Sequence, residues 1–170
     1  NNLYALTSET GEEFIGDHII ITIPSPQAIE LIAQSPIEQK AVKQLRLILY
    51  DPCFALMLHT NQKVEILKNK LDERVFAWQM DNHEKGLSLS YSYTLHTSHE
   101  FSKVHLESPI QITKEVLLSN LPSEFEGVEI LESQLHRWRY SIAQERLEES
   151  FLLSQDGVYF GGDGFGIGNV

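Results

Sequence analysis

The residues best suited to chemistry lie near the end of the chain, in a glycine-rich stretch that follows a short apolar run. Residues 161–168 contain five glycines and one aspartate, Asp163. Glycines at this density allow positive φ angles and let a ligand approach the main chain closely. The Asp163 carboxylate can accept hydrogen bonds from a ribose or ribityl hydroxyl, whereas it repels a phosphate. The stretch therefore predicts part of a ligand site, and a plain Gly-Asp turn is an equally good interpretation.

No recognised catalytic motif accompanies this stretch. The glycines do not fit the G-x-G-x-x-G fingerprint of a dinucleotide phosphate site at any spacing. A serine nucleophile elbow and a P-loop are absent as well. The single cysteine, Cys53, lies within an apolar run, where a thiol is expected to pack inertly. The sequence therefore assigns no catalytic base or nucleophile.

Two histidines three residues apart, His96 and His99, have a spacing that a metal site could use. No further Cys or His completes a ligand set at a recognised spacing, so the sequence favours no metal. His96 fits better as a residue that lines a pocket. It lies in a segment that alternates between apolar and small polar residues.

A later segment combines arginines on one face with aromatic residues on the other. Arg137 and Arg139 could clamp a carboxylate or phosphate, but pairing with the many surface carboxylates of this chain is slightly favoured. His136, Trp138 and Tyr140 could form an aromatic wall against a flat ring. Strand aromatics belong to a core more often, so the wall is the minority interpretation.

The composition excludes several classes of partner. The net charge of -11 argues against nucleic acid, which calls for clustered Lys and Arg. No apolar run approaches the roughly 20 residues that span a bilayer, so we expect no membrane segment. One cysteine rules out an internal disulfide and favours a reducing, cytoplasmic setting. Because Asn1 is not an initiator residue, an upstream segment can be missing.

The elements that must position these residues begin with a predicted hairpin, whose strands are Leu3–Thr7 and Glu12–Ile15. The next predicted element is a strand, His18–Ile23, which is expected to be buried on both faces in a parallel or mixed sheet. Short helices are predicted next, the first over Pro26–Ala33, and Glu38 completes a capping box with the serine three residues before it. The predicted N-capping residues of this and later helices are Ser25, Ser35, Ser98 and Ser108.

Longer segments predict the main sheet. The strand candidates are residues 52–58, 75–80, 88–97 and 128–142. Within the second of them, Phe76, Trp78 and Met80 are expected to share one face. The predicted fold class is α+β, an antiparallel sheet of about six strands with helices packed on one side. The terminal pieces, which include strands at residues 151–153 and 158–160, are expected to belong to another sheet.

Together these residues resemble the C-terminal half of the renalase-like family of FAD-dependent, amine-oxidase-like oxidoreductases. Residues 161–165 resemble the family's second flavin-binding motif, and Trp138–Ser141 resembles its Trp-Arg strand. Further similar segments are Ile19–Gln27, Asp51–Leu56, Asp81–Asn82 and Leu95–Ser98. The family's N-terminal glycine-rich fingerprint is absent from this chain.

The resemblance implies FAD as the cofactor, bound mainly by a Rossmann-type N-terminal half that is missing here. The implied cofactor-binding residues are Gly161, Gly162, Asp163, Gly164 and Phe165. Asp163 would contact the ribityl and pyrophosphate region. Trp138, His96 and Asn82 are implied to lie against the flavin ring and a small-molecule substrate.

The implied activity passes a hydride from an amine or dihydronicotinamide-type substrate to flavin and then to oxygen. The implied organisation is residues 1–24 leading back to the FAD domain, 25–150 as substrate domain, and 151–170 within the FAD domain. We expect this chain alone to hold little or no FAD and to be inactive, with an uncovered sheet face open to a homodimer. A non-catalytic binding or interaction module built on the same sheet is the alternative.

Overall fold

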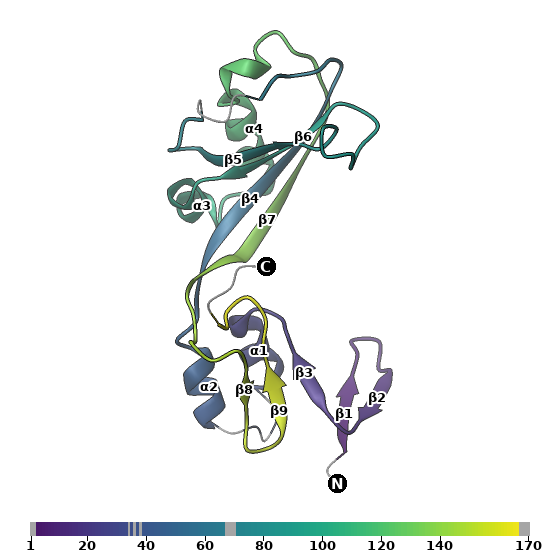
Figure 1. Ribbon diagram of the computed structural model, residues 1–170, viewed down its shortest axis with the longest axis vertical. Helices are drawn as coiled ribbons and strands as arrows, with labels where there is room; N and C mark the ends of the chain where they lie inside the picture. Colours follow the sequence, from purple (N-terminus) through teal and green to yellow (C-terminus); the bar gives the residue numbers. More distant parts are fainter. Residues whose placement is uncertain (1–2, 34, 36, 38, 67–70, 167–170) are drawn as a thin grey trace. The chain divides into compact units, whose positions relative to one another are not determined.

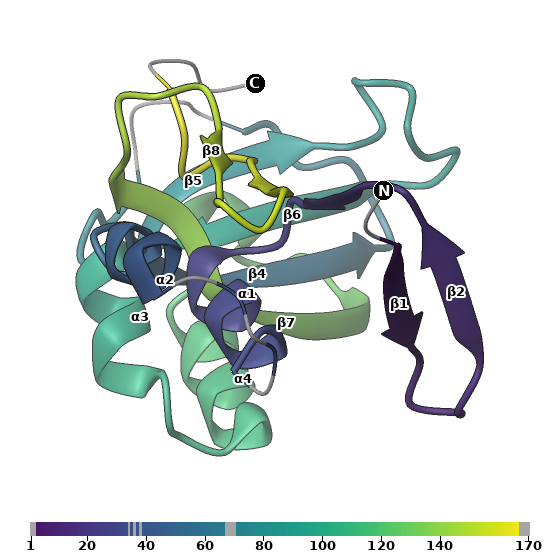
Figure 2. The ribbon, with the colours of Figure 1, turned by 90° about the horizontal axis from the view of Figure 1, so that it is seen from below.

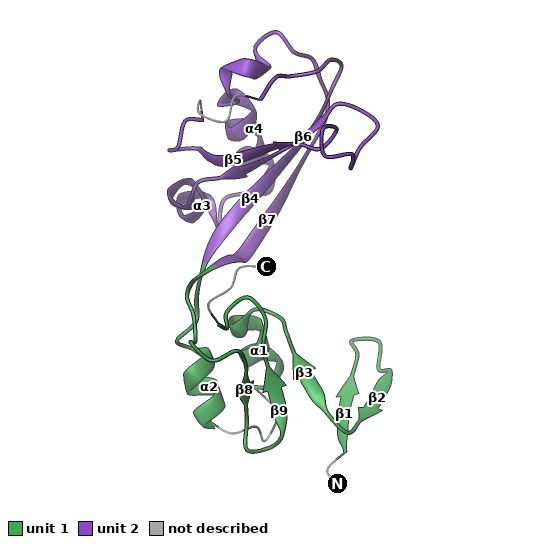
Figure 3. Cartoon of the chain, viewed as in Figure 1, with its two compact units in different colours: residues 1–50, 143–170 green, residues 51–142 purple. Residues whose placement is uncertain are grey.

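The computed structural model describes residues 3–33, 35, 37, 39–66 and 71–166. The chain divides into two compact units, unit 1 with residues 1–50 and 143–170, and unit 2 with residues 51–142 (Figure 3). The predicted substrate domain spans residues 25–150, and unit 2 covers its central part. No helix within the described ranges is both long and apolar enough to cross a bilayer.

Unit 1 contains two small sheets. The predicted hairpin is confirmed, because β1 (Tyr4–Thr7) pairs antiparallel with β2 (Glu13–Gly16). The second sheet has the order β3-β9-β8, with the bounds Ile19–Ile21 for β3, Leu152–Leu153 for β8 and Val158–Phe160 for β9 (Figure 1). β3 and β9 run parallel, and the sequence predicted a parallel or mixed sheet for β3.

The predicted burial of β3 on both faces is wrong. Ile21 is buried, but the side chain of Ile20 is 71% exposed. The reason is that Ile19 and Ile21 pack into the hydrophobic cluster of unit 1, whereas Ile20 points to the other face, which this cluster does not cover. That cluster is formed by residues such as Ala28, Ile48, Val158 and Phe160.

Two short helices, α1 (Ser25–Leu31) and α2 (Gln39–Leu45), pack into the same cluster through Ala28, Ala41 and Leu45. The sequence predicted Ser25 as the N-cap of α1, and this prediction is wrong. Pro24 occupies the cap position in an extended conformation, and no side chain caps the helix. Part of the second predicted capping box, at Glu38 and the preceding proline, lies outside the described residues.

Unit 2 is built on a four-stranded sheet with the order β5-β6-β4-β7. The strands are β4 (Leu49–Thr60), β5 (Phe76–Asp81), β6 (Ser92–Thr97) and β7 (Ile130–Glu145). β4 lies centrally, as predicted from its apolar run. The predicted sheet of about six strands is too large, because the remaining strands pair with each other in the small sheets of unit 1.

Two helices, α3 (His99–His105) and α4 (Ile110–Ser119), lie on the same side of this sheet (Figures 1 and 2). We call the side they cover the covered face; its core residues are Phe54, Leu56, Leu58, Phe76, Tyr93 and Leu95, joined by Phe101 and Leu117 from the helices. The Oγ atom of Ser98 accepts a hydrogen bond from the Phe101 N–H, which confirms the predicted cap of α3. The cap predicted at Ser108 is wrong, because Pro109 takes that position without a side-chain hydrogen bond.

The alternation predicted for residues 88–97 is confirmed only from Ser92 onward. Tyr93 and Leu95 are fully buried on the covered face, and Thr94 and His96 point to the opposite face. Residues 88–91 are not part of a strand, and Leu89 is fully exposed. Hydrogen bonds between Ser88 and Ser90 fold this segment into a local turn instead.

Candidate functional site

The glycine loop, residues 161–166, leaves the carboxyl end of β9 beside the carboxyl end of β3. The Gly161 N–H donates to the Ile21 carbonyl at 3.0 Å, which ties the loop to the neighbouring parallel strand. A turn closes with the Phe165 N–H donating to the Gly162 carbonyl at 3.1 Å. Ligands of open α/β sheets bind outside the carboxyl ends of parallel strands, so the position suits a ligand.

Two glycines in this loop are required by the packing of the chain itself. Gly162 has a φ of 112°, and a Cβ atom there would lie 2.9 Å from the Thr22 carbonyl oxygen. A Cβ on Gly164 would lie 2.7 Å from Cγ2 of Ile48. The sequence attributed these glycines to close approach by a ligand; the structure shows a requirement for each within the chain itself, and the ligand contact stays a prediction. Gly161, in contrast, has nothing within 4 Å of an added Cβ, so it leaves room for a ligand.

Asp163 lies at the exposed tip of the loop, where its Oδ1 accepts a hydrogen bond from the Tyr50 hydroxyl at 3.2 Å. Burial of the phenol, followed by the nearby Asp163 carboxylate, raises the pKa of Tyr50. Tyr50 therefore stays a neutral donor and holds the carboxylate in place. Phe165 is buried in the hydrophobic cluster of unit 1, so its side chain anchors the loop.

The main chain of the loop also offers hydrogen-bond donors. Among the described residues, the N–H groups of Gly162, Asp163 and Gly164 donate to no other backbone group. Successive free N–H groups in a turn favour an anion or a ligand oxygen. The loop thus presents N–H donors and a carboxylate acceptor together.

In unit 2 the sheet side opposite the helices carries no helix among the described residues, and we call it the open face. The β4–β6 and β5–β6 registers align Met57 with Thr94 and Trp78 with His96, which places these four side chains on it. Gln134 of β7 lines the same depression as Met57 and Thr94, so it also lies on the open face. Because side chains alternate along a strand, every second residue of β7 on either side of Gln134 is placed on this face too. The open-face residues are Met57, His59, Trp78, Met80, Thr94, His96, Glu132, Gln134, His136 and Trp138.

The open face carries two aromatic pairs. The ring centroids of Trp78 and His96 are 4.7 Å apart with planes inclined by 35°, and those of His136 and Trp138 are 4.5 Å apart. Trp138 is 52% exposed, so it is a surface aromatic and not a core residue. Desolvation by burial lowers the pKa of His96, which favours the uncharged imidazole near neutral pH.

Asn82 lies just after β5 at the edge of a depression of about 270 Å³ on the open face. Its Nδ2 donates to Oγ1 of Thr94 at 3.0 Å, and its backbone N–H donates to the Ser92 carbonyl at 2.9 Å. These bonds fix the side-chain amide in one orientation. The three residues that the sequence predicted at the substrate, Trp138, His96 and Asn82, therefore all lie on or beside one face of one sheet.

The two arginines of β7 are engaged within the protein. Arg137 donates to the carbonyls of Leu106 and Ser108 at 2.7 and 3.0 Å, and its guanidinium lies 5.7 Å from the centre of the Phe54 ring. Arg139 forms an ion pair with the exposed Glu107. The favoured interpretation, pairing with a surface carboxylate, is confirmed for Arg139, whereas Arg137 binds the end of α3 to the sheet.

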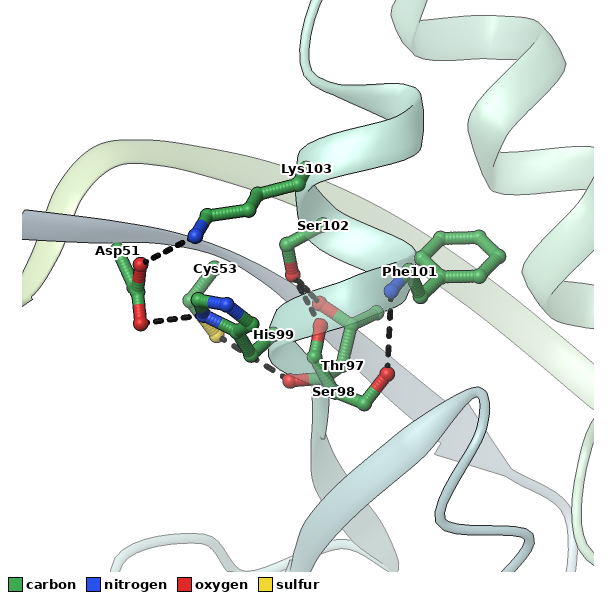
Figure 4. Close-up of polar contacts among 8 residues, drawn as sticks. All are labelled: Asp51, Cys53, Thr97, Ser98, His99, Phe101, Ser102 and Lys103. Atoms are coloured by element: carbon green, nitrogen blue, oxygen red, sulfur yellow. Dashed lines mark hydrogen bonds and ion pairs between the residues drawn. The ribbon is translucent and has the colours of Figure 1, made fainter.

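The sequence missed the partner of the second histidine. His99 Nδ1 contacts the Asp51 carboxylate, which also pairs with Lys103 Nζ at 3.2 Å (Figure 4). Asp51 is only 6% exposed, and its position directly before a buried strand segment was the available signal. His96 and His99 thus belong to different environments. Within the described ranges no group of three potential ligands could hold a metal.

Comparison with solved structures identifies the class of fold. The chain superimposes on reduced UDP-galactopyranose mutase with a TM-score of 0.51 at 11% identity, covering 82% of this chain and 32% of that one. It also matches a protein from Exiguobacterium sp. 255-15, provisionally described as a protoporphyrinogen oxidase, with a TM-score of 0.52 at 12% identity, covering 98% of this chain and 40% of that one. At these identities the likeness concerns the fold alone.

A family comparison then gives the membership. The model of the flavin containing amine oxidoreductases matches residues 1–156, and the chain belongs to this family. No match was found among curated protein sequences. The narrower renalase-like resemblance stays a prediction within this family.

Proposed function

We propose that this chain forms part of an FAD-dependent oxidoreductase of the renalase-like type. Its reaction would pass a hydride from an amine or dihydronicotinamide-type substrate to flavin and then to oxygen. Membership in the flavin containing amine oxidoreductase family supports the cofactor class. When bound, the flavin supplies the hydride acceptor and the reactivity toward oxygen, and the residues of this chain supply binding and orientation.

The glycine loop is the observation that carries this proposal. The N–H groups of Gly162, Asp163 and Gly164, which donate to no backbone group among the described residues, suit the oxygens of a pyrophosphate, and the Asp163 carboxylate suits a ribityl hydroxyl. Gly161 leaves open space beside the main chain at the end of β9. Tyr50 orients the carboxylate without neutralising it, because the phenol donates as a neutral group. The residues present therefore fit the polar part of FAD.

The open face of unit 2 is proposed to bind the substrate. Trp138 offers a flat apolar surface, and His96 and Asn82 offer polar groups without a net charge. A face of this composition excludes water from a reacting centre while still orienting the substrate. Glu132 lines the same depression as Asn82, but no contact identifies it as a base, so we assign only Trp138, His96 and Asn82, and these to binding and orientation.

The remainder of the cofactor site is proposed to come from residues outside this chain. The chain spans 32% and 40% of the two solved structures described above, which supports a contribution from a further FAD-binding half. Homodimerisation through the open face stays a prediction. Sedimentation velocity tests it, because a dimer on that face should be lost when Trp138 is replaced by Glu.

The test compares flavin content in the protein expressed from its complete gene. Asp163→Ala should weaken FAD binding by about 10- to 100-fold, since a hydrogen bond to a charged group is lost. Visible absorbance at the flavin band, measured against protein absorbance after dialysis, reports the occupancy. Glu9→Ala is the matched control, because Glu9 is also an exposed carboxylate of unit 1 but lies in the β1–β2 turn. Equal flavin occupancy in the two variants would remove Asp163 from the cofactor site.

A further inference from the structure

The strand β5 contains a β-bulge that changes which face its tryptophan occupies. Phe76 pairs with Thr97, but Trp78 pairs with His96, so two steps along β5 match one step along β6. Ala77 is the extra residue. Phe76 is therefore fully buried on the covered face, whereas Trp78 is 40% exposed on the open face. Simple alternation predicted both on one face, and the bulge makes that prediction wrong.

Bulges are found next to functional sites, where they redirect a side chain. Here the redirected side chain is the one that stacks on His96, with 4.7 Å between ring centroids. The ammonium of Lys85 lies 5.9 Å from the centre of the same Trp78 ring, so it steadies the ring by a cation–π contact. Moving a large aromatic residue out of a core gives up the stabilisation that its burial would provide. A role for the Trp78 ring on the open face accounts for this loss.

His96 is a half-buried imidazole whose pKa is lowered by desolvation. Burial is the sole cause that lowers its pKa, and no charged group contributes. Within the described part of the chain, neither ring nitrogen of His96 hydrogen-bonds to another protein group. On β4 the residue directly opposite is the apolar Ala55. Among the described residues, the titratable or charged groups on or beside the open face include Asp81, Glu84 and Lys85, which line the depression at Trp78, together with Cys53, His59, Glu132, His136 and Tyr140.

We propose that Trp78 is a positioning residue that holds His96 as an uncharged acceptor for an N–H group of the substrate on the open face. This inference rests on the proposed function, since it names how the substrate is held at the same site. An imidazolium would repel a cationic amine and could not accept its hydrogen bond, whereas the neutral ring does accept it. Both substrate types proposed above carry such a donor.

His99 serves as an internal comparison. It lies three residues further along, but its Nδ1 contacts the buried Asp51 carboxylate, which also pairs with Lys103 (Figure 4). Trp78 takes part in none of these interactions. A change at Trp78 should therefore alter the titration of His96 and leave the contact between His99 and Asp51 intact.

The first arm of the test is an NMR titration of the histidine side chains in the protein expressed from its complete gene. In Trp78→Leu, the His96 pKa should rise toward its ordinary value, because the stacked ring no longer excludes water. In Trp78→Phe, a flat ring is retained and the lowered pKa should be preserved. An unchanged His96 pKa in Trp78→Leu would overturn the positioning role. This arm needs neither bound flavin nor turnover.

The second arm measures KM against pH. KM should rise at acid pH as His96 becomes charged, and in Trp78→Leu this rise should begin at a higher pH, with KM at neutral pH increased about tenfold. His96→Gln keeps an uncharged acceptor and should abolish the pH dependence. A KM profile unchanged by Trp78→Leu would overturn the substrate contact even if the titration shifts. Absence of any flavin turnover in the wild type would instead contradict the proposed function, while the NMR arm still decides the role of Trp78.

Discussion

The covered face and the open face of the four-stranded sheet are built from alternate residues of the same strands, yet they differ in burial and in chemistry. On the covered face Leu56 and Leu95 are fully buried beneath α3 and α4. Their neighbours on the open face, Met57 and His96, remain partly exposed and are joined by two tryptophans. One face therefore supplies the stability of unit 2, while the other is free to carry binding groups.

A similar division separates the two histidines of this region. His99 is held by Asp51, which also pairs with Lys103, and this network fixes α3 to the first residues of unit 2. His96 has no such partner among the described residues and is held only by ring stacking. A charged network serves structure here, whereas the isolated ring stays available to a ligand.

Shortening adjacent side chains of β4 should separate the two faces most clearly. Leu56→Ala should lower the free energy of unfolding by about 2–5 kcal/mol, because it leaves a cavity in the covered face. Met57→Ala should cost less than about 1 kcal/mol, since Met57 is 37% exposed. Denaturant unfolding followed by tryptophan fluorescence measures both. Equal losses would show that the open face is also a core.

A second pair of variants, on β7, should again show the larger loss of stability for the covered face, although the difference should be smaller than for Leu56 and Met57. Arg137→Ala should cost about 1–3 kcal/mol, because the Leu106 and Ser108 carbonyls lose their donor and Phe54 loses the overlying guanidinium. Trp138→Ala should change the free energy of unfolding by less than about 1 kcal/mol, because its ring is exposed. The same denaturant titration applies to both variants.

The functional readout of this pair should show the opposite order. Trp138→Ala is expected to raise KM about tenfold while Arg137→Ala leaves KM near the wild-type value, since only the former lies on the open face. Steady-state kinetics on the folded fractions of both variants gives the comparison. A rise in KM for Arg137→Ala that matches that for Trp138→Ala would place the substrate elsewhere.

Much of the fold follows from local patterns in the sequence. The apolar run of residues 52–58 predicted a central strand, and the alternation over Ser92–Thr97 predicted its two faces, because burial on one or both sides of a sheet dictates residue type. The sequence also predicted the hairpin around Gly11. The φ of Gly11 is 83°, which favours glycine, so the residue type was a reliable signal of the turn.

The parts that the sequence did not reveal depend on pairing between distant segments. The bulge at Ala77 exists only in the register of β5 against β6, so alternation wrongly placed Phe76 and Trp78 on the same face. The size of the sheet was overestimated because a strand pattern does not specify its neighbours. The reasons for Gly162 and Gly164 lie in Thr22 and Ile48, which are far away in the chain.

The residues of the candidate site were named from the sequence, and their roles stay predictions. Trp138, His96 and Asn82 were named before their shared face was known, and the structure brings them together on one sheet. Asp51 was not recognised as the partner of His99, because the two residues meet only through the packing of α3 on β4.

Flavin binding by the protein expressed from its complete gene is the decisive measurement for the proposed function. The purified protein is incubated with excess FAD, and unbound cofactor is then removed. We expect about one flavin per chain, reducible by an amine or dihydronicotinamide under anaerobic conditions. Protein that is folded by circular dichroism yet retains no flavin after this treatment would contradict the proposal.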